Sequence, residues 1–260
     1  SAKNRLKLIS MDNRAGVKEI MYSINQSPFK KYTRPFSLSK PGNLNIETLA
    51  IDHVNNKSRS QKLTNRQSVS YVDLSGPDLS HDFSGPEFIS GDTAFISRKS
   101  KIILRGEDNE AGLRGIEYSY QTDESYTTYN DPFSIKQEGL YTVNYKGYDN
   151  LNNTSLNQFI CQVDNQGPEI YKRFSMVAEK TRQIDGKEYP VFPDHVILFL
   201  SATDSLVGFD RMNYSVNEGR KQPYNRLIEG FEENTRYTIR ATAFDKLGNQ
   251  NSREIIFFIE

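Results

Sequence analysis

Aspartates that end predicted strands are the residues of this sequence best suited to metal or acid–base chemistry. They come in three pairs at recurring positions: Asp12 with Asp52, Asp108 with Asp149, and Asp204 with Asp245. Carboxylate oxygens are preferred ligands of Ca²⁺, and nearby asparagines and backbone carbonyls can supply further oxygens. If strands running in the same direction bring each pair together, the sequence predicts calcium sites at these strand ends.

Turn capping is the competing interpretation of the same aspartates. A carboxylate after a strand can accept hydrogen bonds from backbone N–H groups, and a glycine follows the first aspartate of each pair four residues later. An asparagine follows each second aspartate at the same distance, and we expect it to take the left-handed conformation of a tight hairpin loop. These three asparagines are Asn56, Asn153 and Asn249. No EF-hand motif accompanies the pairs, and their recurrence argues against a catalytic site.

Other reactive side chains are few and scattered. His53, His81 and His195 lie far apart and at different positions within the repeat. The single cysteine, Cys161, alternates with Phe159 and Val163, which predicts a buried thiol on an inward strand face rather than a nucleophile. No Ser/His/Asp motif, glycine-rich phosphate loop or cysteine cluster is present. The sequence therefore predicts no enzyme activity and no cofactor other than calcium.

An internal repeat sets the domain organisation. Asp12, Asp108 and Asp204 are separated by intervals of 96 residues, so the chain of 260 residues holds nearly three domains of ordinary size. We predict a first unit at 1–75, which lacks the opening strand of the others, a second at 76–168 and a third at 169–260 with an extended first segment. The missing strand suggests a segment cut from a longer precursor. No stretch approaches the roughly 20 apolar residues of a membrane span.

Short alternating runs predict an all-β fold. Apolar residues recur at every second position, as in Ile102 and Leu104 before Asp108, and in Leu198 and Leu200 before Asp204. Gly, Asn, Asp, Ser and Pro separate these runs, which is typical of a β-sandwich. The extended opening of the third unit contains Asp185-Gly186, a predicted hairpin tip. We therefore expect three tandem sandwiches in an elongated array.

Three equivalent tyrosines are the predicted core residues. Tyr22, Tyr118 and Tyr214 keep the phase of the inward residues two positions before them, and the chain has no tryptophan to fill a sandwich centre. We expect the three rings to be mostly buried, with their hydroxyls hydrogen-bonded to the backbone near a sheet end.

Charge is distributed unevenly along a chain whose net charge is zero. Residues 1–75 hold 13 Lys/Arg and 5 Asp/Glu, whereas residues 76–168 hold 7 and 14. The asymmetry suggests an acidic protein partner for the first unit. The alternatives are that its basic surface faces the acidic second unit or only solvent. Nothing matches a nucleic-acid-binding motif, so no nucleic-acid partner is expected.

The repeated motifs resemble a known family. In order they are D-N-x-x-G, I-x-Y-S-I, Y-x-x-P-F-S, G-x-Y-x-x-x-Y-x-x-x-D-N and V-D-x-x-G-P. This set resembles the bacterial immunoglobulin-like tandem repeats of the leptospiral outer-membrane surface protein type, also seen in envelope proteins of Bacteroidota. The resemblance covers most of residues 4–168 and is weaker over 169–260, where the P-F-S segment and the glycine are lost. It implies seven-stranded immunoglobulin-like sandwiches, an extracytoplasmic location at the periplasm or cell surface, and no catalytic residues.

Three functions follow as expectations. The first is a non-catalytic spacer, scaffold or docking arm in a bacterial cell-envelope assembly associated with the outer membrane. The second is a surface adhesin or glycan-binding module, for which Tyr126, Tyr129 and Tyr148 would form an aromatic platform. The third is an accessory part of a larger enzyme whose catalytic domain lies elsewhere.

Overall fold

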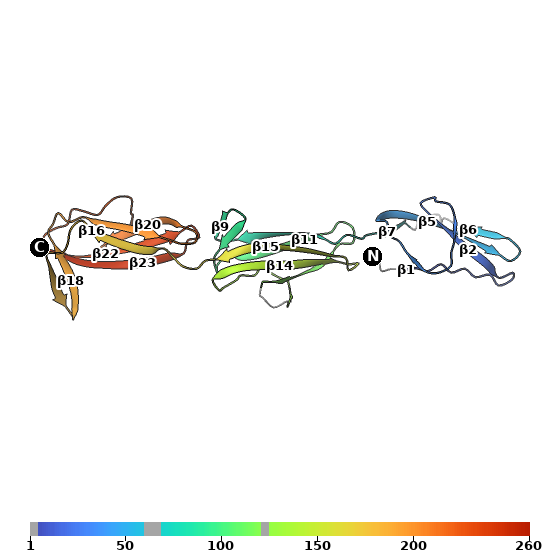
Figure 1. Ribbon diagram of the computed structural model, residues 1–260, viewed down its shortest axis with the longest axis horizontal. Helices are drawn as coiled ribbons and strands as arrows, with labels where there is room; N and C mark the ends of the chain where they lie inside the picture. Colours follow the sequence, from blue (N-terminus) through green and yellow to red (C-terminus); the bar gives the residue numbers. More distant parts are fainter. Residues whose placement is uncertain (1–4, 60–68, 121–124) are drawn as a thin grey trace.

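Three immunoglobulin-like β-sandwiches follow one another along the long axis of the molecule (Figure 1). The computed structural model describes residues 5–59, 69–120 and 125–260. The described strands fall into three groups, β1–β7, β8–β15 and β16–β23, which correspond to the first, second and third unit. The boundaries proposed after residues 75 and 168 lie in the linkers between these groups, and we keep them as working boundaries.

The second unit packs a six-stranded sheet, of order β13-β12-β14-β15-β10-β9, against the pair β11-β8. Its two longest strands, β14 and β15, form the centre of the larger sheet, and β10 joins β15 in parallel. The bounds are β8 Asp78–Ser84, β9 Glu87–Ser90, β10 Thr93–Ile96, β11 Lys101–Glu107, β12 Leu113–Ser119, β13 Thr127–Thr128, β14 Gly139–Asp149 and β15 Thr154–Val163.

The third unit repeats this plan, with the six-stranded sheet β17-β18-β23-β22-β20-β21 and the pair β16-β19. Asp185 and Gly186 form the tip between β17 and β18, both with positive φ, as predicted. This hairpin projects sideways at the C-terminal end of the molecule (Figure 1). The bounds are β16 Glu169–Phe174, β17 Lys180–Ile184, β18 Lys187–Phe192, β19 Leu198–Thr203, β20 Phe209–Val216, β21 Gln222–Pro223, β22 Arg236–Asp245 and β23 Gln250–Ile259.

The first unit has β1 as a shorter counterpart of β11 and β19, and its described residues include no counterpart of β8 or β16. Its central strands run in the order β3-β2-β5-β6, with β7 pairing β5, while β1 pairs only with β4. In the other two units the equivalent strands, β11 and β19, run for six or seven residues against β8 and β16. The bounds are β1 Arg5–Leu6, β2 Val17–Ile24, β3 Lys30–Lys31, β4 Phe36–Ser37, β5 Gly42–Asp52, β6 Lys57–Arg59 and β7 Val69–Val72.

The cores of the second and third units lie between their two sheets. The predicted alternation is confirmed, since Ile102, Leu104, Leu198 and Leu200 are all buried. A residue that the sequence did not single out, Tyr145 on β14, is among the largest fully buried side chains. The core of the third unit contains a cluster of aromatic side chains, which includes Phe174, Phe192, Phe231, Tyr237 and Phe257.

The three predicted core tyrosines differ from one another. Tyr214 is buried, whereas Tyr22 and Tyr118 are half-buried. Each of the latter two stacks on the phenylalanine of the P-F-S motif, Tyr22 on Phe36 and Tyr118 on Phe133, at centroid distances of 4.3 and 3.9 Å. The expected hydrogen bonds from their hydroxyls to the backbone are not found within the described ranges. The expectation of burial is therefore confirmed for Tyr214 and only partly met by Tyr22 and Tyr118, whereas that of hydroxyls bonded to the backbone is not met within those ranges.

Candidate metal centres at the two junctions

The first aspartate of each pair caps the turn that follows it. Oδ1 of Asp108 accepts hydrogen bonds from the backbone N–H groups of Glu110, Ala111 and Gly112, at 3.0, 2.7 and 2.9 Å. Asp12 and Asp204 make the same three bonds, at 2.7–3.3 Å and 3.0–3.1 Å. Gly112 has φ +78°, which explains the recurring glycine four residues after the aspartate.

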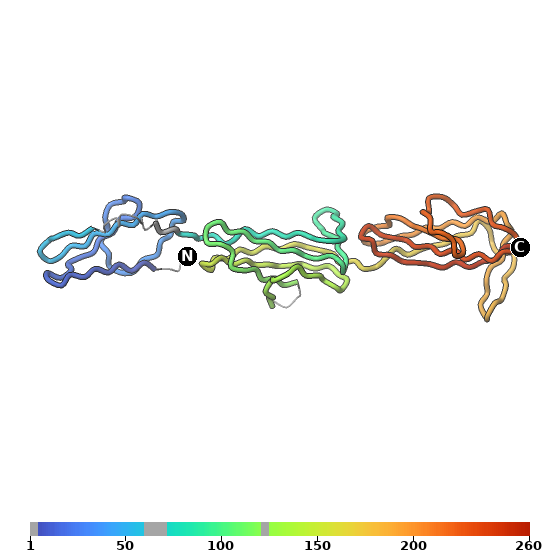
Figure 2. The backbone as a smooth tube through the Cα atoms, turned by 180° about the vertical axis from the view of Figure 1, so that it is seen from behind, coloured from blue at the N-terminus to red at the C-terminus, as the bar shows by residue number. Residues whose placement is uncertain are grey.

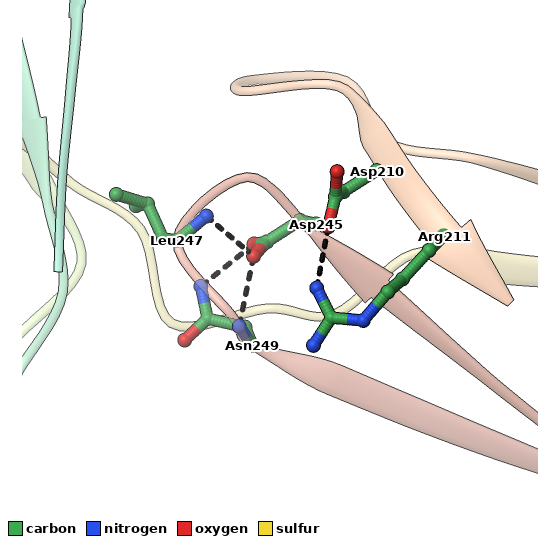
Figure 3. A network of polar contacts seen from close by, with 5 residues as sticks. All are labelled: Asp210, Arg211, Asp245, Leu247 and Asn249. Atoms are coloured by element: carbon green, nitrogen blue, oxygen red, sulfur yellow. Dashed lines mark hydrogen bonds and ion pairs between the residues drawn. The ribbon is translucent and has the colours of Figure 1, made fainter.

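The second aspartate of each pair caps the hairpin loop that follows β5, β14 or β22. Figure 3 shows Asp245, which accepts hydrogen bonds from the N–H groups of Leu247 and Asn249 and from the side-chain amide of Asn249, at 2.9, 2.8 and 2.8 Å. Asp52 and Asp149 are bonded in the same way. The turn-capping interpretation therefore holds for all six aspartates.

The recurring asparagine acts differently from the expectation. The residue with positive φ in each loop is the one before it: Asn55, Asn152 and Gly248, at 67°, 61° and 76°. Asn153 instead uses its amide to bind Asp149 Oδ2 at 2.7 Å. The prediction of a left-handed Asn56, Asn153 and Asn249 was wrong, because these residues already belong to the backbone pairing that closes the loop.

Two aspartates in the linkers, Asp73 and Asp164, lie beside these loops. Neither was predicted as a ligand from the sequence. Asp73 lies with Asp108 and Asp149, and each offers a carboxylate oxygen within 4.8 Å of the other two. Asp164, Asp204 and Asp245 form a second group with the same spacing. Each group thus combines the linker that leaves one unit with the two loops that begin the next. The available signal was the V-D-x-x-G-P motif, which contains both aspartates and which we used only as part of the family resemblance.

The linkers are docked by the same contacts at both junctions. Asn153 donates its side-chain N–H to the carbonyl of Asp73 at 3.3 Å, and Asn249 donates to the carbonyl of Asp164 at 3.0 Å. The linker glycine lies against the next strand so closely that a Cβ on Gly76 would fall 2.5 Å from the backbone of Thr154. A Cβ on Gly167 would fall 2.3 Å from the backbone of Gln250. Glycine is therefore required at both positions by close backbone approach.

The negative charge of the two aspartate groups is not balanced by basic side chains among the described residues. Asp73 and Asp164 are 0% and 1% exposed, and Oδ2 of each has no hydrogen-bond partner among the described residues. Their Oδ1 atoms accept bonds from Ser75 and Gln166 within the linkers. Burial raises the pKa of the Asp164 carboxyl, and the nearby Asp204 and Asp245 carboxylates raise it further. No described Lys, Arg or His forms an ion pair with any of the six carboxylates.

The first unit has the two loops but not the third carboxylate. Asp12 and Asp52 cap their turns as their counterparts do, and the loops are tied by a hydrogen bond from the N–H of His53 to the carbonyl of Gly16, at 3.2 Å. Within the described ranges, no other acidic, histidine or cysteine side chain completes a group of three around them. The predicted pair Asp12–Asp52 thus lacks the arrangement found at the junctions.

The remaining reactive side chains occupy structural positions. The ring of His81 stacks on Phe159 at 3.9 Å, and its Nδ1 lies 3.3 Å from the hydroxyl of Tyr145. The thiol of Cys161 is buried as predicted, and burial raises its pKa to about 11, which keeps it protonated at neutral pH. No helix among the described residues is long and apolar enough to span a membrane.

Comparisons with known proteins were made at three levels. No family model matches the chain, and a search of curated proteins finds no relative. Among solved structures, the fibronectin(III)-like modules of Clostridium thermocellum CbhA are 11% identical, with 70% of this chain and 94% of that chain covered and a TM-score of 0.33. Protocadherin gamma B7 cadherin domains 1–4 are 13% identical, covering 94% and 67%, with a TM-score of 0.31. Mouse cadherin-23 EC22–24 is 14% identical, covering 100% and 92%, with a TM-score of 0.29.

Proposed function

We propose that this chain is a non-catalytic, extracytoplasmic spacer or docking arm in a bacterial cell-envelope assembly associated with the outer membrane. The observation that carries the proposal is the repeated junction, in which each linker is docked onto the loops of the next unit. Two such junctions hold three sandwiches end to end, as seen in both views of the molecule (Figures 1 and 2). An array of this kind extends reach without needing chemistry of its own.

The linkers support a spacer function because contacts along them restrict movement between units. Residues 73–77 connect β7 to β8, and within them Asp73, Ser75 and Gly76 all make close contacts to the second unit or within the linker. Ser75 Oγ also lies 3.2 Å from Oε2 of Glu110 in the loop after Asp108. A connection fixed at several points restricts bending far more than a flexible linker does.

Adhesion through an aromatic platform receives less support from the same surfaces. The Nζ atom of Lys146 lies 4.0 Å from the ring centroid of Tyr126 and 5.7 Å from that of Tyr148. The hydroxyl of Tyr148 donates to Glu117 at 3.2 Å. Tyr129 packs edge-on against Tyr118. These tyrosines are therefore engaged within the second unit, so that a glycan would have to displace existing contacts. The basic first unit remains the proposed place for an acidic protein partner.

Two measurements test the proposal. Small-angle X-ray scattering of the chain should give the maximum dimension of a straight array, and Gly76→Ala should shorten its average length by opening the first junction. Gly115→Ala is the matched control, because a Cβ there meets no atom within 4 Å and the residue lacks a positive φ. Equal scattering of all three proteins would contradict the docked spacer.

The envelope role is tested separately by isolation from native membranes. A tagged chain should sediment with the outer-membrane fraction and retain stoichiometric protein partners after mild detergent extraction. Recovery only as a secreted protein without partners would contradict the envelope role, while leaving the spacer geometry to the scattering experiment.

A further inference from the structure

We propose that each junction binds one Ca²⁺ ion, held jointly by the linker aspartate of one unit and the two loop aspartates of the next. The first site is formed by Asp73, Asp108 and Asp149, and the second by Asp164, Asp204 and Asp245. This inference concerns metal binding alone and stands whether or not the chain is an envelope spacer. It differs from the prediction of one calcium site at each aspartate pair. A junction site needs a linker aspartate as its third ligand, so the pair Asp12–Asp52 of the first unit is not expected to bind calcium.

The first observation is the concentration of negative charge. Three carboxylates lie within 4.8 Å of one another in each group, and no described basic side chain is paired with them. Each group carries three negative charges when ionised. The capping N–H groups neutralise part of the charge on the loop aspartates, but each carboxylate keeps oxygen lone pairs for a further ligand. A divalent cation removes the mutual repulsion.

The second observation is independent of charge and comes from hydrogen bonding. Oδ2 of Asp73 and Oδ2 of Asp164 are the two side-chain polar atoms that are buried without any partner in the described part of the chain. Native structures rarely leave such an atom unsatisfied, and an ion is one of the few explanations. Both atoms belong to the two linker aspartates, at equivalent positions. Coincidence in two separate junctions is a poor account of this repetition.

The ligand type selects calcium among common cations. All side chains in the two groups are carboxylates, with no cysteine or histidine, so soft and borderline metals such as zinc are disfavoured. Calcium–oxygen distances are about 2.3–2.6 Å, which places opposite ligands about 4.6–5.2 Å apart. Carboxylates already within 4.8 Å therefore fit around one Ca²⁺ with little movement. Magnesium, with bonds of about 2.0–2.1 Å and a strict octahedron, requires a tighter arrangement.

Binding at this place links two units. Asp73 contributes from the linker, and its carbonyl is bound by Asn153 in the same loop that contains Asp149. An ion held by all three carboxylates can bind fully only when the linker is docked. Calcium should therefore stabilise both the docked junction and the loops of the following unit, because a ligand favours the state that binds it.

The experiment uses the chain of residues 1–260, stripped with a chelator and titrated with CaCl₂ by isothermal calorimetry at neutral pH. We expect two ions per chain, with a higher melting temperature at about 5 mM Ca²⁺, above the range of about 0.1–1 mM typical for extracellular calcium modules. Hydrogen exchange by mass spectrometry should slow at residues 73–77 and 164–168. The same titration with MgCl₂ should give a smaller thermal shift.

Variants locate the sites. Asp73→Asn and Asp164→Asn keep an acceptor for Ser75 and Gln166 but remove the charge, so each should reduce the stoichiometry from two ions to one. The double variant should bind none. Asp12→Asn is the matched control and should still bind two. The proposal is overturned if the parent chain binds no calcium, which would indicate protonated carboxylates, or if the double variant binds as the parent does. Hydrogen exchange in chelator distinguishes misfolded variants from folded ones.

Discussion

The first and second units each have a corner, formed by the two loops that follow the paired aspartates. The two corners contain aspartates at equivalent positions, in turns of the same kind. Asp12 and Asp108 each accept three backbone hydrogen bonds, and Asp52 and Asp149 each bind the asparagine four residues later. Only the second corner gathers a third carboxylate, which Asp73 brings from the preceding linker. Local sequence is therefore sufficient for the turn, whereas the candidate cation site requires a neighbouring unit.

The largest expected effect tests whether the first and second units unfold independently of each other. The side chain of Tyr145 is fully buried, with 0% of its surface exposed to solvent. Tyr145 lies opposite Tyr118 in the pairing of β14 with β12. Tyr145→Ala should destabilise the second unit by about 3–5 kcal/mol, because it leaves a cavity. Hydrogen exchange should accelerate across residues 76–163 and leave β2 and β5 unchanged. Equal acceleration in both units would show that the corners depend on one shared folding unit.

A smaller effect is expected when the hairpin aspartate is truncated in either corner. Asp149→Ala leaves the N–H groups of Leu151 and Asn153 without acceptors, and Asp52→Ala does the same to Val54 and Asn56. Each hydrogen bond contributes about 0.5–1.5 kcal/mol net, so losing the two backbone bonds should destabilise each unit by about 1–3 kcal/mol. Chemical denaturation followed by hydrogen exchange measures both.

The two truncations should differ in a second respect. In chelator, Asp149→Ala also removes one of three mutually repelling charges, so part of its cost is offset, whereas Asp52→Ala has no such compensation. Identical sensitivity of both variants to ionic strength would argue that the third carboxylate does not affect the second corner.

Neutralising the first aspartate of each pair should destabilise the first and second units by different amounts. Backbone N–H groups of Arg14, Ala15 and Gly16 lower the pKa of Asp12. At Asp108 burial raises the pKa, but bonds from Gly112, Ala111 and Glu110 outweigh it and lower the pKa overall. Both are therefore ionised at neutral pH. In chelator, Asp12→Asn and Asp108→Asn should each lower the melting temperature of their own unit, because a lowered pKa means that the folded unit favours the ionised carboxylate. The loss should be smaller for Asp108→Asn, because this change also relieves repulsion from Asp73 and Asp149.

Salt provides the control for this pair of variants. The difference between the two losses should shrink as NaCl is raised, because screening weakens repulsion between partly exposed carboxylates. Losses of equal size in both units, or a difference that does not respond to salt, would contradict the like-charge explanation.

The smallest effect concerns histidines in the same two units. Partial burial against Phe159 and Tyr145 lowers the pKa of His81, and the nearby Asp82 opposes this shift. The unfolded value is about 6.5, and the folded value is lower, so the stabilising contribution is present above pH 6.5 or so. It is lost as the pH falls from about 6.5 toward the folded value. His53 in the first unit is exposed.

The stability of the second unit should thus decline relative to the first as the pH falls below about 6.5. His81→Phe preserves a ring to stack on Phe159 and removes the titration, so the decline should disappear. Thermal melts at several pH values measure it. A decline of the same size in the variant would assign the pH dependence to other groups.

Local regularities made much of the fold predictable. The alternation of Ile102 and Leu104 identified a buried strand face, and Asp185-Gly186 identified a hairpin tip, because each depends on residues adjacent in sequence. The core tyrosine was predicted less well. Tyr118 keeps the inward phase, but it stacks on Phe133, which belongs to the segment between β13 and β14. Tyr145 was missed because the sequence offers no way to rank inward residues by depth.

The sequence alone determined the repeat, the all-β class and the capped turns, since backbone donors within four residues of an aspartate are always within its reach. Only the tertiary structure decided which carboxylates meet. Asp73 and Asp149 come together because Gly76 permits close approach to Thr154 and because Asn153 binds the linker carbonyl. These contacts are made between residues far apart in the sequence. The spacing of aspartates within one repeat therefore could not reveal a third ligand that the preceding repeat supplies.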